Sequence, residues 1–168
     1  EKWAVEYETV GFTLGEGIKD TVDINSYTIS GLNIGEGIDL YVKSICTGDN
    51  NSSGWTAPCS FVALPSGGFG TLVNPYRIGT IQDLDILSKQ PSIWSTHFIL
   101  INDIDASETK TTSTYNNGGL GFSPIGNSTK KFTGTFKGKG HVISNLYINR
   151  NQFNVGLFGY VGSGVRID

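Results

Sequence analysis

The sequence predicts an all-β protein in two parts, an N-terminal part like a β-sandwich and a C-terminal part that coils after one short helix. Short alternating strands in the first part are separated by turn signals every ~8–12 residues, which is the spacing of a sandwich. Glycine contributes 23 of 168 residues, about twice its usual frequency. In the second part the glycines recur at the ends of short strands. This pattern is typical of a parallel β-helix, whose chain turns at each strand end.

Composition excludes several functional classes. Charged residues make up only 16% of the chain, and the net charge is -3. The longest basic run is Lys130-Lys131, which argues against nucleic acid as a partner. No apolar run approaches the ~20 residues that span a membrane, so we expect no membrane insertion. The chain starts at Glu1 without any methionine or visible signal peptide, and we expect it to be a piece of a longer extracellular protein.

Residues 1–64 hold five candidate strands, WAVEY, GFTL, SYTIS, IDLYVKSI and CSFVAL. Cys46 and Cys59 flank the polar turn TGDNNSSGWTAP. If the flanking segments pair as a hairpin, the two thiols face each other and form a disulfide in an oxidising compartment. The alternative is that both are small apolar residues that never bond.

Residues 65–75 read as a linker rich in glycine and proline. Ile81, Leu84 and Leu87 then recur every three residues, which predicts one helix over residues 80–90 that ends before Pro91. Strand HFILINDID and the polar excursion ASETKTTSTYNNGG follow.

The stretch from Phe132 to Gly159 reads FTGTFKGKGHVISNLYINRNQFNVGLFG. Its apolar residues, Val142 and Val155 among them, are candidates for inward positions that stack between successive coils. We expect tight corners with positive φ at its glycines. These are Gly134, Gly138, Gly140, Gly156 and Gly159.

The run FSPIGNSTKKFTGTFKGKGHVISNLYI and the later Gly-Leu-Phe-Gly beginning at Gly156 resemble the GLUG-motif repeats of filamentous-haemagglutinin-like proteins. YRIGTIQDLDILS with FILINDID is similar to the segment that opens such domains. Over residues 76–168 the resemblance implies a right-handed parallel β-helix that begins with a capping helix and stops before it is complete. Lys137 departs from the family, which usually has Asp there.

Residues 1–64 resemble the later part of a fibronectin type III domain from secreted Bacteroidetes proteins. SYTISGLNIGEGIDLYVKSIC and WTAPCSF carry this resemblance. Ile38 occupies the usual position of the corner tyrosine, and two strands of such a domain have no counterpart. The resemblance therefore implies a partial sandwich with an unpaired edge, and exposed β edges permit self-association.

Candidate chemistry is sparse. Asp103 and Asp105 could bind Ca²⁺ through oxygen ligands, or they could bind their own backbone in a turn; the sequence leaves this open. Sugar hydrolysis needs two carboxylates held ~5–9.5 Å apart, and no motif predicts such a pair. We expect no enzyme activity, no metal site and no cofactor.

One residue is a candidate for contact with a glycan, and another is a candidate for glycan attachment. Tyr115, inside TSTYNNGG, is the aromatic side chain that we expect to be exposed for stacking on a glycan. Thr21, in Asp20-Thr21-Val22, fits the O-glycan attachment pattern that the resemblance to Bacteroidetes proteins allows.

By analogy with the families it resembles, we expect a non-catalytic part of a secreted or bacterial cell-surface protein of adhesin type. Its partner would be a host or cell-surface protein or glycan. The alternative is an accessory module of a secreted glycan- or protein-degrading enzyme whose catalytic domain lies outside this chain.

Overall fold

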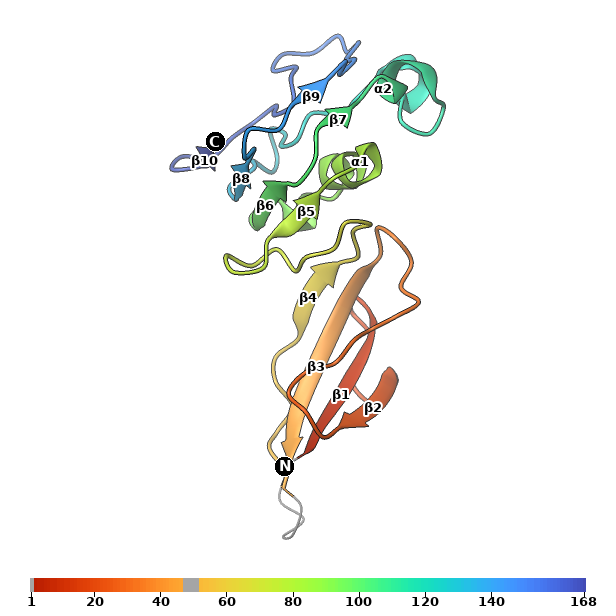
Figure 1. Cartoon of the computed structure of the whole chain (residues 1–168), viewed down its shortest axis with the longest axis vertical. Helices are drawn as coiled ribbons and strands as arrows, with labels where there is room; N and C mark the ends of the chain where they lie inside the picture. Colours follow the sequence, from red (N-terminus) through yellow and green to blue (C-terminus); the bar gives the residue numbers. More distant parts are fainter. Residues whose placement is uncertain (1, 47–51) are drawn as a thin grey trace. The chain divides into compact units, whose positions relative to one another are not determined.

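The computed structural model describes residues 2–46 and 52–168, which belong to two compact units, Glu1–Ala63 and Leu64–Asp168. Over the described residues strands make up most of the regular structure, and the helices are few and short (Figure 1). The predicted β-rich class is therefore confirmed. Each unit is described below by itself.

Unit 1 contains a single four-stranded antiparallel sheet with the strand order β2-β1-β3-β4. β1 and β3 are its long central strands, and they pair from Lys2↔Ile45 to Thr9↔Ile38. The strands are β1 (Lys2–Thr9), β2 (Ile18–Val22), β3 (Gly37–Ile45) and β4 (Cys59–Val62).

Two of the five expected strands, GFTL and SYTIS, are not strands, and Ile18–Val22 pairs with β1 instead. A buried carboxylate explains the first difference. Glu6 is 1% exposed, and its Oε1 accepts hydrogen bonds from the N–H groups of Gly15 and Gly17. These hydrogen bonds hold the segment after β1 in a turn. Phe12, in this turn, packs edge-on against Tyr41, with 5.4 Å between the ring centres.

The expected two-layered sandwich is not formed by the described residues of unit 1, because its four strands all belong to one sheet. Beside the segment that carries Phe12, the segment around Tyr27 packs on the sheet, with its ring 6.0 Å from that of Tyr7. Ile38, at the position of the missing corner tyrosine, is buried.

The expected disulfide is not present: Cys46 and Cys59 are free and exposed. The register of β3 and β4 gives the reason, because Cys59 lies opposite Leu40 at one end of the pairing. Cys46 follows Ile45, at the far end of β3. Six residues of extended strand correspond to ~20 Å, far beyond the ~4.4–6.8 Å between the Cα atoms of a disulfide. Part of the intervening turn, residues 47–51, lies outside the described residues.

We therefore expect both thiols to be alkylated without prior reduction. Treating the native, non-reduced protein with iodoacetamide should add two alkyl groups to the intact mass, because both thiols are free and exposed to the reagent. An intact mass that gains no alkyl group until a reductant is added would contradict the register of β3 and β4.

Unit 2 is built from very short strands that pair in parallel. β5, β6, β8 and β10 form a sheet of order β10-β8-β6-β5, and β7 pairs with β9 (Figure 1). The strands are β5 (Tyr76–Ile78), β6 (His97–Leu100), β7 (Ile104–Asp105), β8 (Thr135–Lys137), β9 (Ile143–Ser144) and β10 (Arg166–Ile167). The helices are α1 (Ile81–Lys89), α2 (Glu108–Thr111) and the 3-10 turns η1 (Pro91–Ile93) and η2 (Asn117–Gly119).

Successive passes of the chain lie side by side in the same direction. Phe98 pairs with Phe136, and further along the same passes Ile104 pairs with Ile143. Isolated parallel bridges, Ile125↔Phe158 and Phe132↔Val161, continue this pairing beyond the strands. Parallel strands must be joined by long connections that return the chain to the same end. The pass that begins at β8, which we call the second pass, therefore repeats the path of the first pass, which begins at β6.

Aromatic rings form a continuous column inside unit 2. Tyr76 stacks on Phe98 at 5.5 Å, Phe98 lies 5.9 Å from Phe132, and Phe132 lies 5.0 Å from Phe158. Phe98 and Phe132 are completely buried. Val142 and Val155, by contrast, are more than half exposed, so the expectation that they point inward is wrong.

The predicted helix is confirmed as α1, residues Ile81–Lys89. Thr80 begins it: its side chain accepts a hydrogen bond from the N–H of Asp83, whose carboxylate accepts one from the N–H of Thr80. This reciprocal capping box satisfies two N–H groups that a helix start leaves unpaired. Leu84 and Leu87 are completely buried. The short α2, inside the predicted polar excursion, was not predicted.

Residues 65–75, expected to be a linker, belong to unit 2. The carbonyl of Gly67 accepts a hydrogen bond from the N–H of Arg77, and the carbonyl of Gly70 accepts one from the N–H of His97. The segment therefore runs beside β5 and β6.

Most of the expected corner glycines in the second pass do not lie in tight turns, and some of them let the backbones of neighbouring passes approach closely. Of the five expected corners, only Gly140 has a positive φ, of 81°. At Gly134 a Cβ would lie 1.9 Å from the carbonyl oxygen of Thr96. There the chain of one pass touches the backbone of the previous pass, and a side chain has no room.

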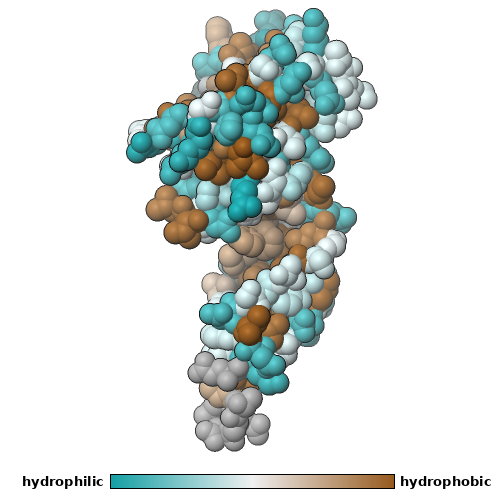
Figure 2. Space-filling view, in the orientation of Figure 1, coloured by the Kyte–Doolittle hydropathy of each residue, from teal (hydrophilic) through white to brown (hydrophobic). Residues whose placement is uncertain are grey.

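The surface in view is mixed in polarity. Figure 2 shows hydrophobic and hydrophilic residues alternating in small patches over that face. Single exposed apolar residues are normal on a soluble surface, although Phe153, at 91% exposed, is an extreme case.

Candidate functional site

A polar hollow of about 340 Å³ lies on unit 2. It is bordered by the C-terminal end of α1, the segment after η2 and the chain that follows β9. Its walls are formed by Ser88, Lys89, Pro91, Trp94, Ser123, Pro124, Gly126, Asn127, Arg150, Gln152, Asn154 and Tyr160. We call it the Arg150 hollow.

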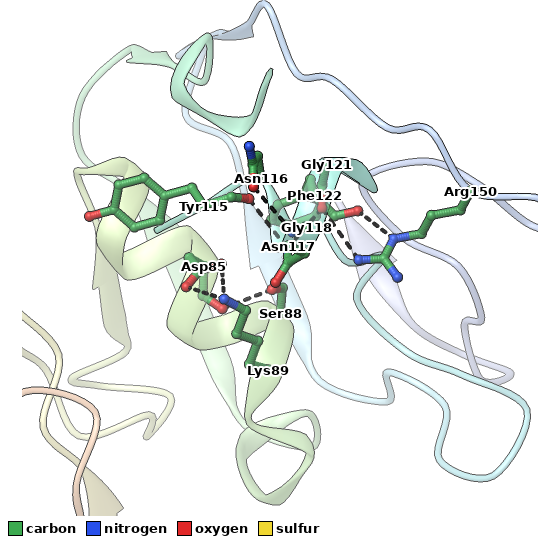
Figure 3. A network of polar contacts seen from close by, with 10 residues as sticks. All are labelled: Asp85, Ser88, Lys89, Tyr115, Asn116, Asn117, Gly118, Gly121, Phe122 and Arg150. Atoms are coloured by element: carbon green, nitrogen blue, oxygen red, sulfur yellow. Dashed lines mark hydrogen bonds and ion pairs between the residues drawn. The ribbon is translucent and has the colours of Figure 1, made fainter. Parts of the chain in front are cut away.

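An asparagine–glycine turn precedes Ser123, one of the residues that line this hollow. Asn116 accepts a hydrogen bond from the N–H of Gly118, and Asn117 donates from Nδ2 to the carbonyl of Gly121 at 2.8 Å (Figure 3). Asn117 and Gly118 have φ values of 48° and 69°, a conformation that asparagine and glycine tolerate best. The turn thus holds the carbonyl group of Gly121, next to Phe122.

The carbonyl groups of Gly121 and Phe122 hold Arg150. Its Nε donates to the carbonyl of Phe122 at 3.0 Å and its Nη2 to that of Gly121 at 3.3 Å (Figure 3). In the described part of the chain, no carboxylate forms a salt bridge with Arg150. Carbonyl groups satisfy N–H donors but carry no net charge, so the guanidinium charge is left without a counter-charge.

Lys89, by contrast, has a partner. Its Nζ lies 2.8 Å from Oδ1 and 2.9 Å from Oδ2 of Asp85, one turn earlier in α1. Burial raises the pKa of Asp85, and the Lys89 charge lowers it by a smaller amount. The side chain of Lys89 is 39% exposed and that of Asp85 13%, and exposed helical pairs of this kind contribute only ~0.3–0.5 kcal/mol.

The remaining lining is suited to hydrogen bonding with a polar ligand. Asn127, Gln152 and Asn154 are exposed amides, and Tyr160 is half-buried. Within the described residues, no carboxylate, imidazole or thiol lines the hollow. The arrangement can bind anions and hydroxyl groups, but it offers no general acid–base pair.

Asp103 and Asp105, the candidate Ca²⁺ ligands, instead connect the two passes of the coil. Asp103 Oδ1 accepts from the N–H of Val142 at 3.0 Å and lies 3.1 Å from Nδ1 of His141. Asp105 Oδ1 accepts from Asn145 at 3.0 Å and also from the N–H of Ser107. Among the described residues no group of three or more His, Cys, Asp or Glu could hold a metal ion.

These hydrogen bonds lower the pKa of both carboxyl groups. The Val142 N–H has the largest effect on the pKa of Asp103, followed by His141, and Asn145 has the largest effect on that of Asp105. A carboxyl group whose pKa is lower in the folded state stabilises the fold above its unfolded pKa. That contribution is lost as the pH falls through the folded pKa.

The stability of unit 2 should therefore fall as the pH drops below the ordinary Asp pKa of about 4. Thermal unfolding followed by circular dichroism between about pH 6 and pH 2 measures the fall. A variant with Asp103→Asn and Asp105→Asn should lose less stability over the same range. Equal losses in the two proteins would show that these carboxylates do not carry the effect.

The other sequence-predicted residues lie elsewhere. Tyr115 is half-buried rather than exposed, and it does not line the hollow; burial raises its pKa, with smaller effects from the charges of Glu108 and Asp85. Thr21 is exposed on the edge strand β2 of unit 1. Sequence reasoning missed Arg150 and Lys89, because only the fold brings their distant segments together.

A second hollow, of about 390 Å³, lies within unit 1 over β1, β2 and β3. Trp3, Val5, Leu40 and Val42 line it, and the residues that line it include no charged side chain. Tyr27 borders it, and burial, followed by a hydrogen bond with Tyr7, raises the pKa of Tyr27 to about 12. Its walls are mainly apolar, and within the described residues they include no acidic, basic or thiol side chain.

Comparisons with known proteins find two relatives and no family. No family model and no solved structure matches the chain. Halomucin from Haloquadratum walsbyi is 44% identical over 101 residues, which are 58% of this chain and 1% of halomucin. A putative Gly-rich membrane protein from Evansella cellulosilytica is 39% identical over 98 residues, 58% of this chain and 11% of that protein. The chain thus spans a small fraction of the length of these relatives.

Within the described residues, no helix has the length and apolar character needed to cross a lipid bilayer.

Proposed function

We propose that this chain is a non-catalytic structural and binding part of a secreted or cell-surface protein of adhesin type. In this proposal unit 2 is the beginning of a right-handed parallel β-helix of GLUG type, and α1 is its cap. Unit 1 corresponds to a partial fibronectin type III-like domain.

The observation that carries the proposal is the parallel pairing of successive passes at two separate sheets, β6 with β8 and β7 with β9. Side chains join the same two passes: Asp105 binds Asn145, 40 residues later, and the N–H of Tyr147 donates to Thr109, 38 residues earlier. A coil that repeats its own path is rigid, elongates by adding repeats and presents side chains at regular intervals. These properties suit display and adhesion.

The position of α1 supports its role as a cap. The helix packs next to β5, the edge strand of its sheet, and buries Leu84 and Leu87. Covering one end of a coil protects its apolar core from water and its edge from unwanted pairing.

The names of the two relatives support a location at the surface or in association with a membrane. One is called halomucin and the other a putative Gly-rich membrane protein. We carry this location to the present chain as part of the proposal.

The proposal is tested on intact cells that produce the full-length protein. An antibody raised against unit 2 should label unpermeabilised cells, and external protease should remove the signal. Labelling that appears only after permeabilisation would contradict a surface location. The complete open reading frame tests the non-catalytic role, because a hydrolase or lyase domain in the same chain would favour the accessory-module alternative.

A further inference from the structure

We propose that the Arg150 hollow binds a sugar that carries an anionic group, either a carboxylate or a sulfate ester. This inference rests on the proposed function, because it names the ligand class of a binding surface on unit 2. Three observations support it: the positive charge of the hollow, the fixed orientation of the Arg150 guanidinium, and the polar and apolar side chains of the walls.

The charge of the hollow is positive in a chain that is negative overall. Its walls include Lys89 and Arg150 and, within the described residues, no Asp or Glu, while the chain carries a net charge of -3. Lys89 is already neutralised by Asp85, which is not part of the lining. The uncompensated charge therefore belongs to Arg150.

Arg150 is also held in one orientation before any ligand arrives. The carbonyl groups of Phe122 and Gly121 engage Nε and Nη2, and no hydrogen bond to Nη1 occurs within residues 2–46 and 52–168. A guanidinium fixed in this way loses little side-chain entropy on binding. Its free N–H groups fit the paired oxygens of a carboxylate or sulfate.

The walls favour a sugar over a simple anion. Asn127 is oriented because its Oδ1 accepts from the N–H groups of Thr129 and Lys130, which leaves its amide nitrogen for a ligand. Gln152 and Asn154 add exposed amides that both donate and accept, as sugar hydroxyls require. Pro124 and Tyr160 supply apolar surface beside them, and the volume of about 340 Å³ is within the range of small-molecule sites.

The test titrates the ¹⁵N-labelled chain with an oligomer of galacturonic acid, a sulfated heparin-derived oligosaccharide, a neutral galactose oligomer and polyglutamate. Chemical-shift changes should map to the side-chain amides of Asn127, Gln152 and Asn154. At least one anionic sugar should bind about tenfold or more tightly than the neutral oligomer, and the two anionic arms distinguish carboxylate from sulfate. Equal binding of the neutral oligomer, equally tight binding of polyglutamate, or shifts that map elsewhere would overturn the proposal.

Arg150→Gln should weaken binding of the anionic sugar about tenfold or more. Lys139→Gln is the matched control: it removes one exposed positive charge at another hollow, lined by Lys137, Lys139 and Arg166, and should leave affinity unchanged. If both variants bound the anionic sugar equally weakly, the binding would reflect non-specific attraction between charges, and the assignment of the site to the Arg150 hollow would be wrong.

Because Arg150 also holds two carbonyl groups, its replacement could unfold the turn. The double variant Gln152→Ala and Asn154→Gly removes two exposed side chains, and glycine tolerates the φ of 60° at position 154. It should weaken binding several-fold with little change in thermal stability. Unchanged affinity in this variant would overturn the assignment of the walls. If no sugar binds while intact cells are still labelled, the ligand class is wrong and the surface role stands.

Discussion

Asp83→Ala should lower the free energy of unfolding of unit 2 by about 3–5 kcal/mol. Asp83 is completely buried. Its carboxylate accepts five hydrogen bonds: from N–H and Oγ of Ser66, the N–H of Gly79, and N–H and Oγ1 of Thr80. Without the carboxylate, three backbone N–H groups lose their acceptor in a partly buried place, and such a loss costs up to about 1–3 kcal/mol where the group is shielded from water.

Hydrogen exchange of peptides from unit 2, measured by mass spectrometry across a urea series, reports this loss without interference from unit 1. Asp83→Asn should be milder than Asp83→Ala, because the amide oxygen can take the place of Oδ2, which accepts four of the five hydrogen bonds. The amide nitrogen then faces only the N–H of Ser66, which loses its acceptor. Asp85→Ala, on the same helix, is the control and should cost about 1 kcal/mol at most, since it removes an ion pair with the partly exposed Lys89 and no acceptor of a backbone N–H. A loss from Asp83→Ala as small as that of the control would refute the role of this carboxylate.

Gly134→Ala should be the most damaging glycine substitution in the second pass, with a cost of about 3 kcal/mol or more. The added Cβ would lie 1.9 Å from the carbonyl oxygen of Thr96. The N–H of Gly134 donates to the carbonyl of Trp94, so the two passes cannot separate without losing this hydrogen bond. Relief of the overlap would also disturb the pairing of β6 with β8.

Gly140→Ala provides the comparison. Gly140 has a φ of 81° but nothing within 4 Å of an added Cβ, so its substitution costs only the backbone strain of ~1–2 kcal/mol. The same exchange experiment ranks the two variants. If Gly140→Ala destabilised unit 2 more than Gly134→Ala, backbone conformation and not close approach would govern the glycines of the coil.

Local features could be predicted from the sequence because neighbours in the chain cause them. The spacing of Leu84 and Leu87 and the stop at Pro91 gave the position of α1. The glycine-rich strands predicted short parallel strands, and β6 pairs in parallel with β8 and β7 with β9. A periodic pattern of apolar residues needs no long-range information to be recognised.

Features that depend on register could not be predicted. Cys46 and Cys59 looked like hairpin partners, but β3 and β4 pair with Cys59 opposite Leu40. The buried carboxylate of Glu6 turned an expected strand into a loop, and sequence patterns do not reveal which distant N–H groups a carboxylate will reach.

By itself the sequence determined the β-rich class and the one helix that was predicted, because these follow from backbone geometry and short-range periodicity. Tertiary structure alone decided that Arg150 meets the carbonyl groups of Gly121 and Phe122, that Asp103 joins His141 across 38 residues, and that Gly134 touches Thr96. Each of these contacts joins residues whose separation along the chain is set by how long each pass happens to be. These contacts form only when the passes pack against one another.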